Sequence, residues 1–272
     1  MNVKEFEGTI AVIGGGMMGE TMVSGLVKAG ISPHRLRVAD ASPARLDYLR
    51  ERYGVASAAT NADAVFEASV VLLVVKPQVL MPVMAEIADV LEPDALVISL
   101  AAGIGLARLE AALRPGSLVV RVMPNTPAKI GAGMTVISPG RHVSADRVGL
   151  VEALMGAVGR TIVLDERYQD AAAAISGCGP AYVFLVAEAL IDTGVRMGLT
   201  RDVATLLAGQ MLAGSGQLLV ISGEHPAILR NQVTSPGGTT AAALAELEAH
   251  GLRTAFADAM LASAARSAEL GA

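Results

Sequence analysis

The stretch Thr9-Ile-Ala-Val-Ile-Gly-Gly-Gly-Met-Met-Gly19 decides the fold of this chain. Its first part, up to Ile13, is a short apolar run that ends abruptly at three glycines, which predicts a buried parallel strand. From Met17 to Ala29 apolar residues recur at helical spacing, and Gly30 is a typical residue to end that helix. A strand, a glycine-rich turn and a helix are therefore expected in succession near the start of the chain.

The glycines of the pattern Gly14-x-Gly16-x-x-Gly19 each have a separate physical role. Gly14 permits a tight turn, Gly16 lets the backbone approach a pyrophosphate, and Gly19 lets the helix pack closely on the strand. The N-terminus of the helix adds free N–H groups and a partial positive charge, which attract phosphates. These residues predict a Rossmann-type unit that binds a dinucleotide.

Strands and helices continue to alternate along the first half of the chain. Further strands are predicted over 36–39, 70–75, 96–100, 118–123, 134–138 and 161–164, and helices over 43–53, 82–91, 107–113 and 145–157. This alternation is typical of a doubly wound α/β sheet. After Asp165 only helices are predicted, over 171–175, 181–197, 203–219, 240–248 and 254–269. We therefore expect a dinucleotide-binding α/β domain over residues 1–165 and an all-α, helical domain over residues 166–272.

Asp40 ends the second predicted strand, 21 residues after Gly19. At this position an acidic residue binds the 2′-hydroxyl of the adenine ribose of NAD. Ser42 and Arg45 could instead contribute to a site for the 2′-phosphate of NADP. A third interpretation makes Asp40 a turn residue before the helix that starts at Ser42-Pro43. These residues leave the choice between NADH and NADPH open.

The composition excludes several classes of protein. The 21 basic and 26 acidic residues give a net charge of −5, which argues against binding to a nucleic-acid backbone. The 4 Tyr and 4 Phe, with no Trp, offer little for stacking bases. Cys178 is the one cysteine, so an intrachain disulfide and a Cys-cluster zinc site are excluded, and no spacing of His, Asp or Glu suggests a metal. With no signal peptide visible at the N-terminus, we expect a cytoplasmic protein.

The chain is nonetheless strongly apolar, with 53% hydrophobic and 17% charged residues. Val203–Gly223 has no charge and is long enough to span a bilayer. However, Gln210 and Gln217 would be costly in lipid. We therefore expect no membrane span here but a helix buried against a neighbouring subunit, which its glycines allow to approach closely.

A turn rich in glycine and hydroxyl groups, Ser235-Pro-Gly-Gly-Thr-Thr240, precedes the apolar helical segment Ala241–Leu247. A turn of this kind at a helix start exposes several backbone N–H groups and can bind a carboxylate. A simpler interpretation is that Thr239 or Thr240 caps the helix. Spacing alone leaves both interpretations open.

Seven strings of residues, taken together, carry a family resemblance. They are Ile13-Gly-Gly-Gly-Met-Met-Gly-Glu20, Val75-Lys-Pro-Gln78, Ser99-Leu-Ala-Ala-Gly-Ile104, Arg121-Val-Met-Pro-Asn-Thr-Pro127, Ser176-Gly-Cys-Gly-Pro-Ala-Tyr182, His225-Pro-Ala-Ile-Leu229 and Gln232-Val-Thr-Ser-Pro-Gly-Gly-Thr-Thr240. In this order the chain resembles the pyrroline-5-carboxylate reductase family from end to end. Such enzymes reduce 1-pyrroline-5-carboxylate to L-proline with NADPH or NADH, the last step of proline biosynthesis.

The resemblance implies roles for individual residues. On the substrate side, the carboxylate would lie against Ser235, Gly238 and Thr239, and the Thr240 hydroxyl would lie at the ring nitrogen. On the cofactor side it adds Met17 and Met18 in the phosphate loop, Asn61 at the adenosine end, Val75, Lys76 and Pro77 after the strand over 70–75, and Ala101 and Ala102 at the nicotinamide pocket. A solvated loop charge at Lys76 and ordinary packing at the two alanines are the simpler interpretations. The resemblance also implies dimers that assemble into rings such as decamers.

The chain departs from the family pattern at three positions. Cys178 stands where serine is more common, and Asn231 stands where aspartate is usual. Asp40 stands where many members have a small or hydroxyl residue, which puts their usual preference for NADPH in question here.

Two other functions remain as alternatives. A related imine reductase or a β-hydroxyacid dehydrogenase-like oxidoreductase also joins a Rossmann half to a helical half. Such an enzyme would place a catalytic lysine or acid early in the helical domain, and residues 170–181 contain no lysine. A nucleotide-sensing protein without turnover is the second alternative, and the intact turn from Ser235 to Thr240 argues against it.

Overall fold

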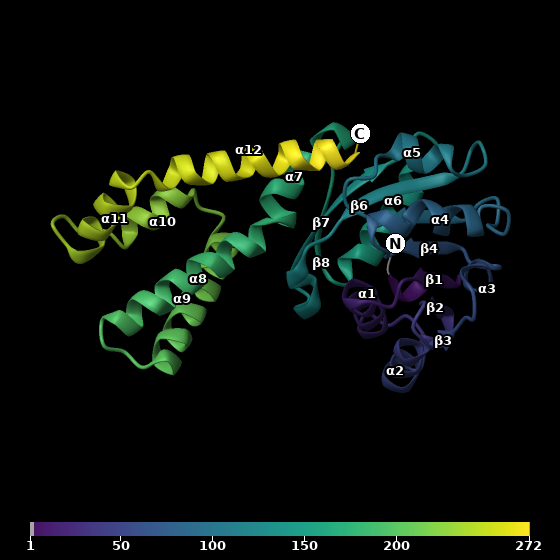
Figure 1. Ribbon diagram of the computed structural model, residues 1–272, viewed down its shortest axis with the longest axis horizontal. Coiled ribbons are helices and arrows are strands. Elements are labelled where there is room, and N and C mark those ends of the chain that lie inside the picture. Colours follow the sequence, from purple (N-terminus) through teal and green to yellow (C-terminus); the bar gives the residue numbers. More distant parts are fainter. Residues whose placement is uncertain (1–2, 272) are drawn as a thin grey trace. The chain divides into compact units, whose positions relative to one another are not determined.

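A computed structural model describes residues 3–271 of the chain (Figure 1). The residues form two compact units: one runs to Gly177 and includes the segment from Ser263 onward, and the other is Cys178–Ala262. The predicted domain boundary, between residues 165 and 166, lies twelve residues before Gly177, where the first part of that unit ends. The domain division at 165/166 remains a prediction.

The first unit contains a single sheet and most of the shorter helices. Its strands are β1 (Ile10–Ile13), β2 (Leu36–Ala39), β3 (Ala56–Ser57), β4 (Val70–Leu73), β5 (Leu96–Ser99), β6 (Leu118–Met123), β7 (Gly133–Pro139) and β8 (Gly159–Val163). Its α-helices are α1 (Met17–Lys28), α2 (Pro43–Tyr53), α3 (Asn61–Val65), α4 (Pro77–Ile87), α5 (Leu106–Ala111), α6 (Ala145–Gly156) and α7 (Gln169–Ala172). Short 3₁₀ helices cover Val3–Glu5, Pro33–Arg35, Thr126–Ile130 and Glu166–Tyr168, and a π-helical turn covers Ala173–Gly177.

The strand order of the sheet is β3-β2-β1-β4-β5-β6-β7-β8. Strands β1 to β6 are parallel, and Ile10 of β1 pairs with Leu36 on one side and with Val70 on the other. β7 is antiparallel to β6 and parallel to β8. The order therefore reverses between β1 and β4, and ligands of open α/β sheets bind at such a switch point, outside the carboxyl ends of the strands.

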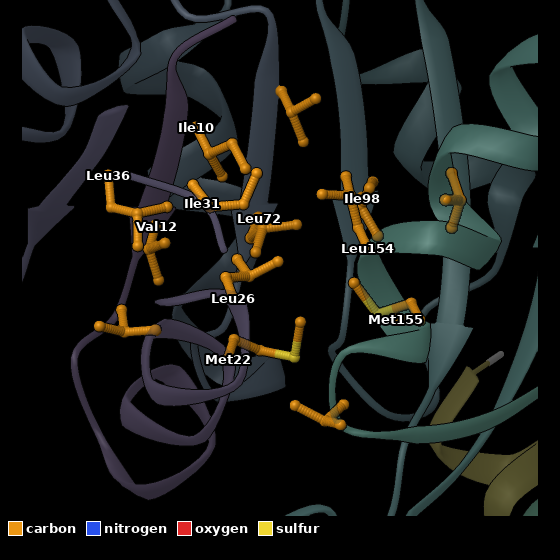
Figure 2. Close-up of a cluster of buried hydrophobic side chains, with 14 of the residues drawn as sticks. Ile10, Val12, Met22, Leu26, Ile31, Leu36, Leu72, Ile98, Leu154 and Met155 are labelled. Carbon is orange, nitrogen blue, oxygen red and sulfur yellow. The ribbon is translucent and has the colours of Figure 1, made fainter. Parts of the chain in front are cut away.

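Alternate residues of the strands build two cores, one on each face of the sheet. On one face Val12 and Leu72 pack with Met22 of α1 and Leu154 of α6 (Figure 2). On the other face Ile13 and its neighbours pack with side chains of α3, α4 and α5. The central strands are buried on both sides, which confirms the predicted doubly wound α/β architecture.

The second unit is entirely helical. It comprises α8 (Gly179–Arg196), α9 (Arg201–Ser222), α10 (Pro226–Gln232), α11 (Thr239–Ala249) and the greater part of α12 (Leu252–Gly271). α8 and α9 pack side by side, and Gly194 permits a close approach because a Cβ there would lie 3.2 Å from that of Ala204.

Much apolar surface of the helical unit is uncovered in the single chain. The helical runs Glu166–Arg196 and Arg201–Ser222 are long and apolar enough to cross a membrane, yet only 6% and 11% of their most apolar windows are buried. Leu206 and Ile221 of α9 are 72% and 81% exposed. The helical unit therefore exposes a large apolar surface.

Candidate functional site

The glycine loop at the end of β1 is held by its neighbours. The N–H of Gly14 donates to Ala39 O of β2 at 2.8 Å, and Val74 N after β4 donates to Ile13 O at 2.8 Å. Gly14 has a φ of +100°, and a Cβ on it would lie 2.4 Å from Val74 O. A Cβ on Gly19 would lie 1.9 Å from Gly14 O, so both positions require glycine for close packing.

The loop has room for a phosphate group at Gly16. A Cβ on Gly16 would meet nothing within 4 Å, in contrast to the crowded positions at Gly14 and Gly19. Gly16 is also the N-cap of α1, and it supplies no side-chain hydrogen bond to the first turn. Met17 is exposed, and Met18 is half-buried. The loop therefore fits a dinucleotide pyrophosphate, which would lie at the positive end of α1.

Asp40 lies against this loop. Its Oδ2 accepts a hydrogen bond from Gly15 N at 2.7 Å, and its Oδ1 accepts one from Ser42 N at 2.9 Å. Ser42 is the N-cap of α2 but makes no side-chain capping bond. Asp40 is thus a turn residue before α2, as one interpretation of the sequence held, and its carboxylate is also placed beside the phosphate loop.

Sequence reasoning missed a polar network beside the loop. The Arg45 guanidinium donates to Glu20 and to Gly15 O, and the hydroxyls of Tyr48 and Tyr53 donate to Glu20 Oε1 at 3.0 and 2.9 Å. Burial alone raises the pKa of Glu20, but the hydrogen bonds from these three side chains outweigh it and hold the pKa below its usual value. No sequence motif signalled this network, because its members lie 25 to 33 residues apart on α1 and α2.

The remaining predicted cofactor residues lie at the carboxyl ends of neighbouring strands. Val75 follows β4, exposed Lys76 is the N-cap of α4, and Pro77 is the first residue of that helix. After β5, Ala101 is buried and Ala102 is exposed. The structure therefore brings these residues to the same edge of the sheet as the glycine loop.

Asn61, the remaining predicted cofactor residue, is engaged in a side-chain contact with another helix. It is the first residue of α3, and its Nδ2 donates to Glu86 Oε2 at 2.5 Å. The contact holds the Asn61 amide against Glu86 of α4. A role for Asn61 at the adenosine end of the cofactor remains a prediction.

The predicted substrate residues belong to the helical unit. Gly238 N donates to Ser235 O at 3.0 Å, and Gly237 has a φ of +69°, which makes the segment a type II turn with Pro236 at its second position. The turn leads directly into α11, whose N-cap is Gly238.

The threonines after this turn do not cap the helix. Thr239 and Thr240 are the first two residues of α11, and the N-cap residue makes no side-chain hydrogen bond. The simpler interpretation of the sequence, in which one of the two threonines caps the helix, is therefore wrong. Within residues 3–271 neither hydroxyl has a hydrogen-bond partner, so both are free to contact a ligand. Exposed backbone N–H groups at the start of α11 add donors that suit a carboxylate.

The described part of the chain holds no group of three or more His, Cys, Asp or Glu side chains that could bind a metal ion. His225, at the start of one of the family strings, is the N-cap of α10, and its Nδ1 accepts a hydrogen bond from Ala227 N at 3.2 Å. This histidine therefore has a structural contact in the turn before the helix.

Two family models match the chain. Residues 9–103 match the model described as NADP oxidoreductase coenzyme F420-dependent, and residues 166–270 match the model for pyrroline-5-carboxylate reductase dimerisation. The second match covers the helices that leave the apolar surface uncovered.

The chain is similar along its length to curated relatives and solved structures. The pyrroline-5-carboxylate reductase of Corynebacterium melassecola is 45% identical, with 97% of this chain and 98% of the relative aligned. The reductase of Pisum sativum is 39% identical over 96% of each chain. Among structures, the reductase from Coxiella burnetii has a TM-score of 0.93 at 38% identity and covers 98% of this chain and 100% of its own. The Plasmodium falciparum reductase with NADP bound has a TM-score of 0.88 at 28% identity and covers 98% and 99%.

Proposed function

The chain belongs to the pyrroline-5-carboxylate reductase family. On this premise we propose which of its residues bind the substrate and the cofactor when the cyclic imine of 1-pyrroline-5-carboxylate is reduced to L-proline with NADPH or NADH. It is an oxidoreductase of proline biosynthesis. The observation that carries the proposal is the free pair of threonine hydroxyls at the N-terminus of α11.

The reaction needs little acid–base chemistry from the protein. When bound, the nicotinamide would supply a hydride to the imine carbon, with the electron pair of the C=N bond moving to nitrogen. If nitrogen is already protonated in solution, no negative charge develops there and no strong protein acid is required. The protein then acts mainly by positioning the imine and by excluding unproductive orientations.

The turn before α11 holds the substrate carboxylate. Ser235 and Thr239 offer hydroxyl donors. Gly238, whose own N–H donates to Ser235 O, keeps the start of α11 close to Ser235, since a Cβ on it would lie 2.5 Å from Ser235 Oγ. The positive end of α11 favours the negative charge of the carboxylate. These contacts fix one end of the ring.

Thr240 completes the substrate site. Its hydroxyl lies one residue further into α11 than that of Thr239 and is half-buried. It contacts the ring nitrogen, where its oxygen accepts a hydrogen bond from the protonated imine and so orients it. Thr240 is therefore the catalytic residue of the proposal.

The cofactor lies along the sheet edge already described. Gly14, Gly16 and Gly19 with Met17 and Met18 receive the pyrophosphate at α1, and Asp40, Ser42 and Asn61 face the adenosine. Val75, Lys76 and Pro77 with the small Ala101 and Ala102 leave space for the nicotinamide. The support for these roles is the open position at Gly16 and the common edge at the carboxyl ends of the strands.

The chain associates with copies of itself through the region that matches the dimerisation model. We propose that two helical domains, residues 166–272, interlock as a dimer, that dimers assemble into a ring such as a decamer, and that the protein works in the cytoplasm without a membrane partner. The uncovered apolar side chains of α9 support a protein partner, because the family model matches the same helices.

The test is the loss of nicotinamide absorbance on addition of 1-pyrroline-5-carboxylate. Thr240→Ala should lower kcat/KM by about 100-fold, as the loss of one positioned hydrogen-bonding group does, with cofactor binding retained. Thr240→Ser should recover most of the rate, and Thr254→Ala, on the exposed face of α12, should match the parent chain. No turnover with either cofactor, or unchanged kinetics in Thr240→Ala, would contradict the proposal.

A further inference from the structure

We propose that this reductase uses NADH in preference to NADPH and that Asp40 sets the preference. The inference rests on the proposed function for the substrate used in the kinetic measurement. The geometry of the cofactor site supports it independently.

Asp40 directly follows β2, the strand next to β1, and it therefore lies where the adenine ribose of a bound dinucleotide is read. Its Oδ2 is 2.7 Å from Gly15 N, so the carboxylate is fixed to the phosphate loop itself. Its Oδ1 is held by Ser42 N. The carboxylate is thus oriented before any cofactor binds, with lone pairs left to accept the 2′-hydroxyl of NADH.

The partners of Asp40 leave its charge in place. Both are neutral backbone N–H groups, and no ion pair in residues 3–271 includes Asp40. A 2′-phosphate would bring a second anion to the same position, and like charges in one site cost binding free energy. A hydroxyl carries no such cost.

The arginines of β2 and α2 are engaged with other groups of the protein, so none of them is free to bind a 2′-phosphate. Arg45 lies at the phosphate loop, but its guanidinium is bound to Glu20 and to Gly15 O. The others are held as follows: Arg50 by Asp47, Arg52 by Glu20 and the rings of Tyr48 and Tyr53, and Arg37 by the carbonyls of Asp63 and Phe66. The residues that directly follow Asp40, Ala41-Ser-Pro-Ala44, contain no basic side chain. A site for a 2′-phosphate needs such a group.

The experiment measures Kd for NADH and for NADPH by nicotinamide fluorescence, without substrate, and then kcat/KM with both. We expect NADH to be favoured about 10- to 100-fold in Kd. Asp40→Asn removes the charge and keeps an oxygen for Ser42 N, whereas its amide nitrogen cannot accept from Gly15 N. Circular dichroism verifies that the variant is folded. In this variant the preference should fall at least about tenfold, whereas Asp47→Asn, on the exposed part of α2, should leave it unchanged.

Each result decides the inference. Equal binding of NADH and NADPH, a preference for NADPH, binding of neither, or an unchanged ratio in folded Asp40→Asn would overturn it. Selective binding of NADH without reduction of 1-pyrroline-5-carboxylate would support the inference while contradicting the proposed function. Reduction of 1-pyrroline-5-carboxylate with equal use of both cofactors would support the proposed function and contradict the inference.

Discussion

The guanidinium of Arg121 donates from Nη1 to Glu166 Oε1 at 3.1 Å, and so links β6 to the segment where the match to the dimerisation model begins. The same carboxylate oxygen accepts Leu106 N at 2.7 Å. On its other side, Nη2 of Arg121 is 3.7 Å from Asp170, which accepts a hydrogen bond from Ser267 of α12. Arg121 thus neutralises the carboxylates of Glu166 and Asp170. Through them β6 is linked to the start of α5 and to the end of α12.

Arg121→Met should therefore destabilise the protein by about 2–3 kcal/mol, because it leaves two partly buried carboxylates without their cation. The Arg121 side chain is only 12% exposed, so solvent screens this interaction weakly. Urea unfolding at a fixed protein concentration would measure the change. Arg266→Met breaks a surface ion pair with Glu269 and should have little effect, and equal losses in the two variants would contradict the argument.

Two glycines of the phosphate loop should respond in opposite ways to alanine. Gly19→Ala places a methyl group against Gly14 O and should cost at least about 1–3 kcal/mol of stability. Gly16→Ala meets open space and should leave the melting temperature unchanged, yet raise Kd for NADH at least about tenfold by keeping the pyrophosphate away. Thermal unfolding and cofactor titration of both variants would separate the roles. Equal melting temperatures, or an unchanged Kd in Gly16→Ala, would contradict them.

The clearest predictions came from segments whose local pattern is strong. Helix α2 spans Pro43–Tyr53 as predicted, because proline at its first position starts it and Gly54, with a φ of +72°, ends it. The two-residue strand β3 was missed because two exposed residues have no periodicity. α10 is absent from the predicted helices, since seven residues after a His-Pro pair give too few turns for an apolar stripe.

For the site, the glycine pattern and Asp40 could be identified from the sequence as candidates, because the proposed roles depend on a fixed spacing. The network around Glu20 could not, since it forms only when α1 and α2 pack. Similarly, the free hydroxyls of Thr239 and Thr240 depend on where α11 begins, and a difference of one residue decides whether a threonine caps a helix.

The lowered pKa of Glu20 predicts a pH dependence of stability. A carboxylate with a depressed folded-state pKa stabilises the protein above its ordinary value of 4.5, and this contribution is lost as the pH falls through the folded-state pKa. Glu20→Gln should therefore be less stable than the parent chain at neutral pH, by about 1–3 kcal/mol. The difference should shrink below pH 4.5. Urea unfolding across this range would show it, and a gap that widens on acidification would contradict the assignment.

The uncovered face of α9 should control self-association. Leu206→Glu places a charge on a helix where Leu206 is 72% exposed in the single chain, and burying that charge in a dimer interface would be costly. Analytical ultracentrifugation should therefore show dissociation at concentrations where the parent chain is associated. Ile130→Glu is the matched control, because Ile130 is 82% exposed but lies in the sheet unit, outside the matched dimerisation region. If both variants dissociate, or if neither does, the interface does not lie on α9, and the apolar residues of that helix require another covering.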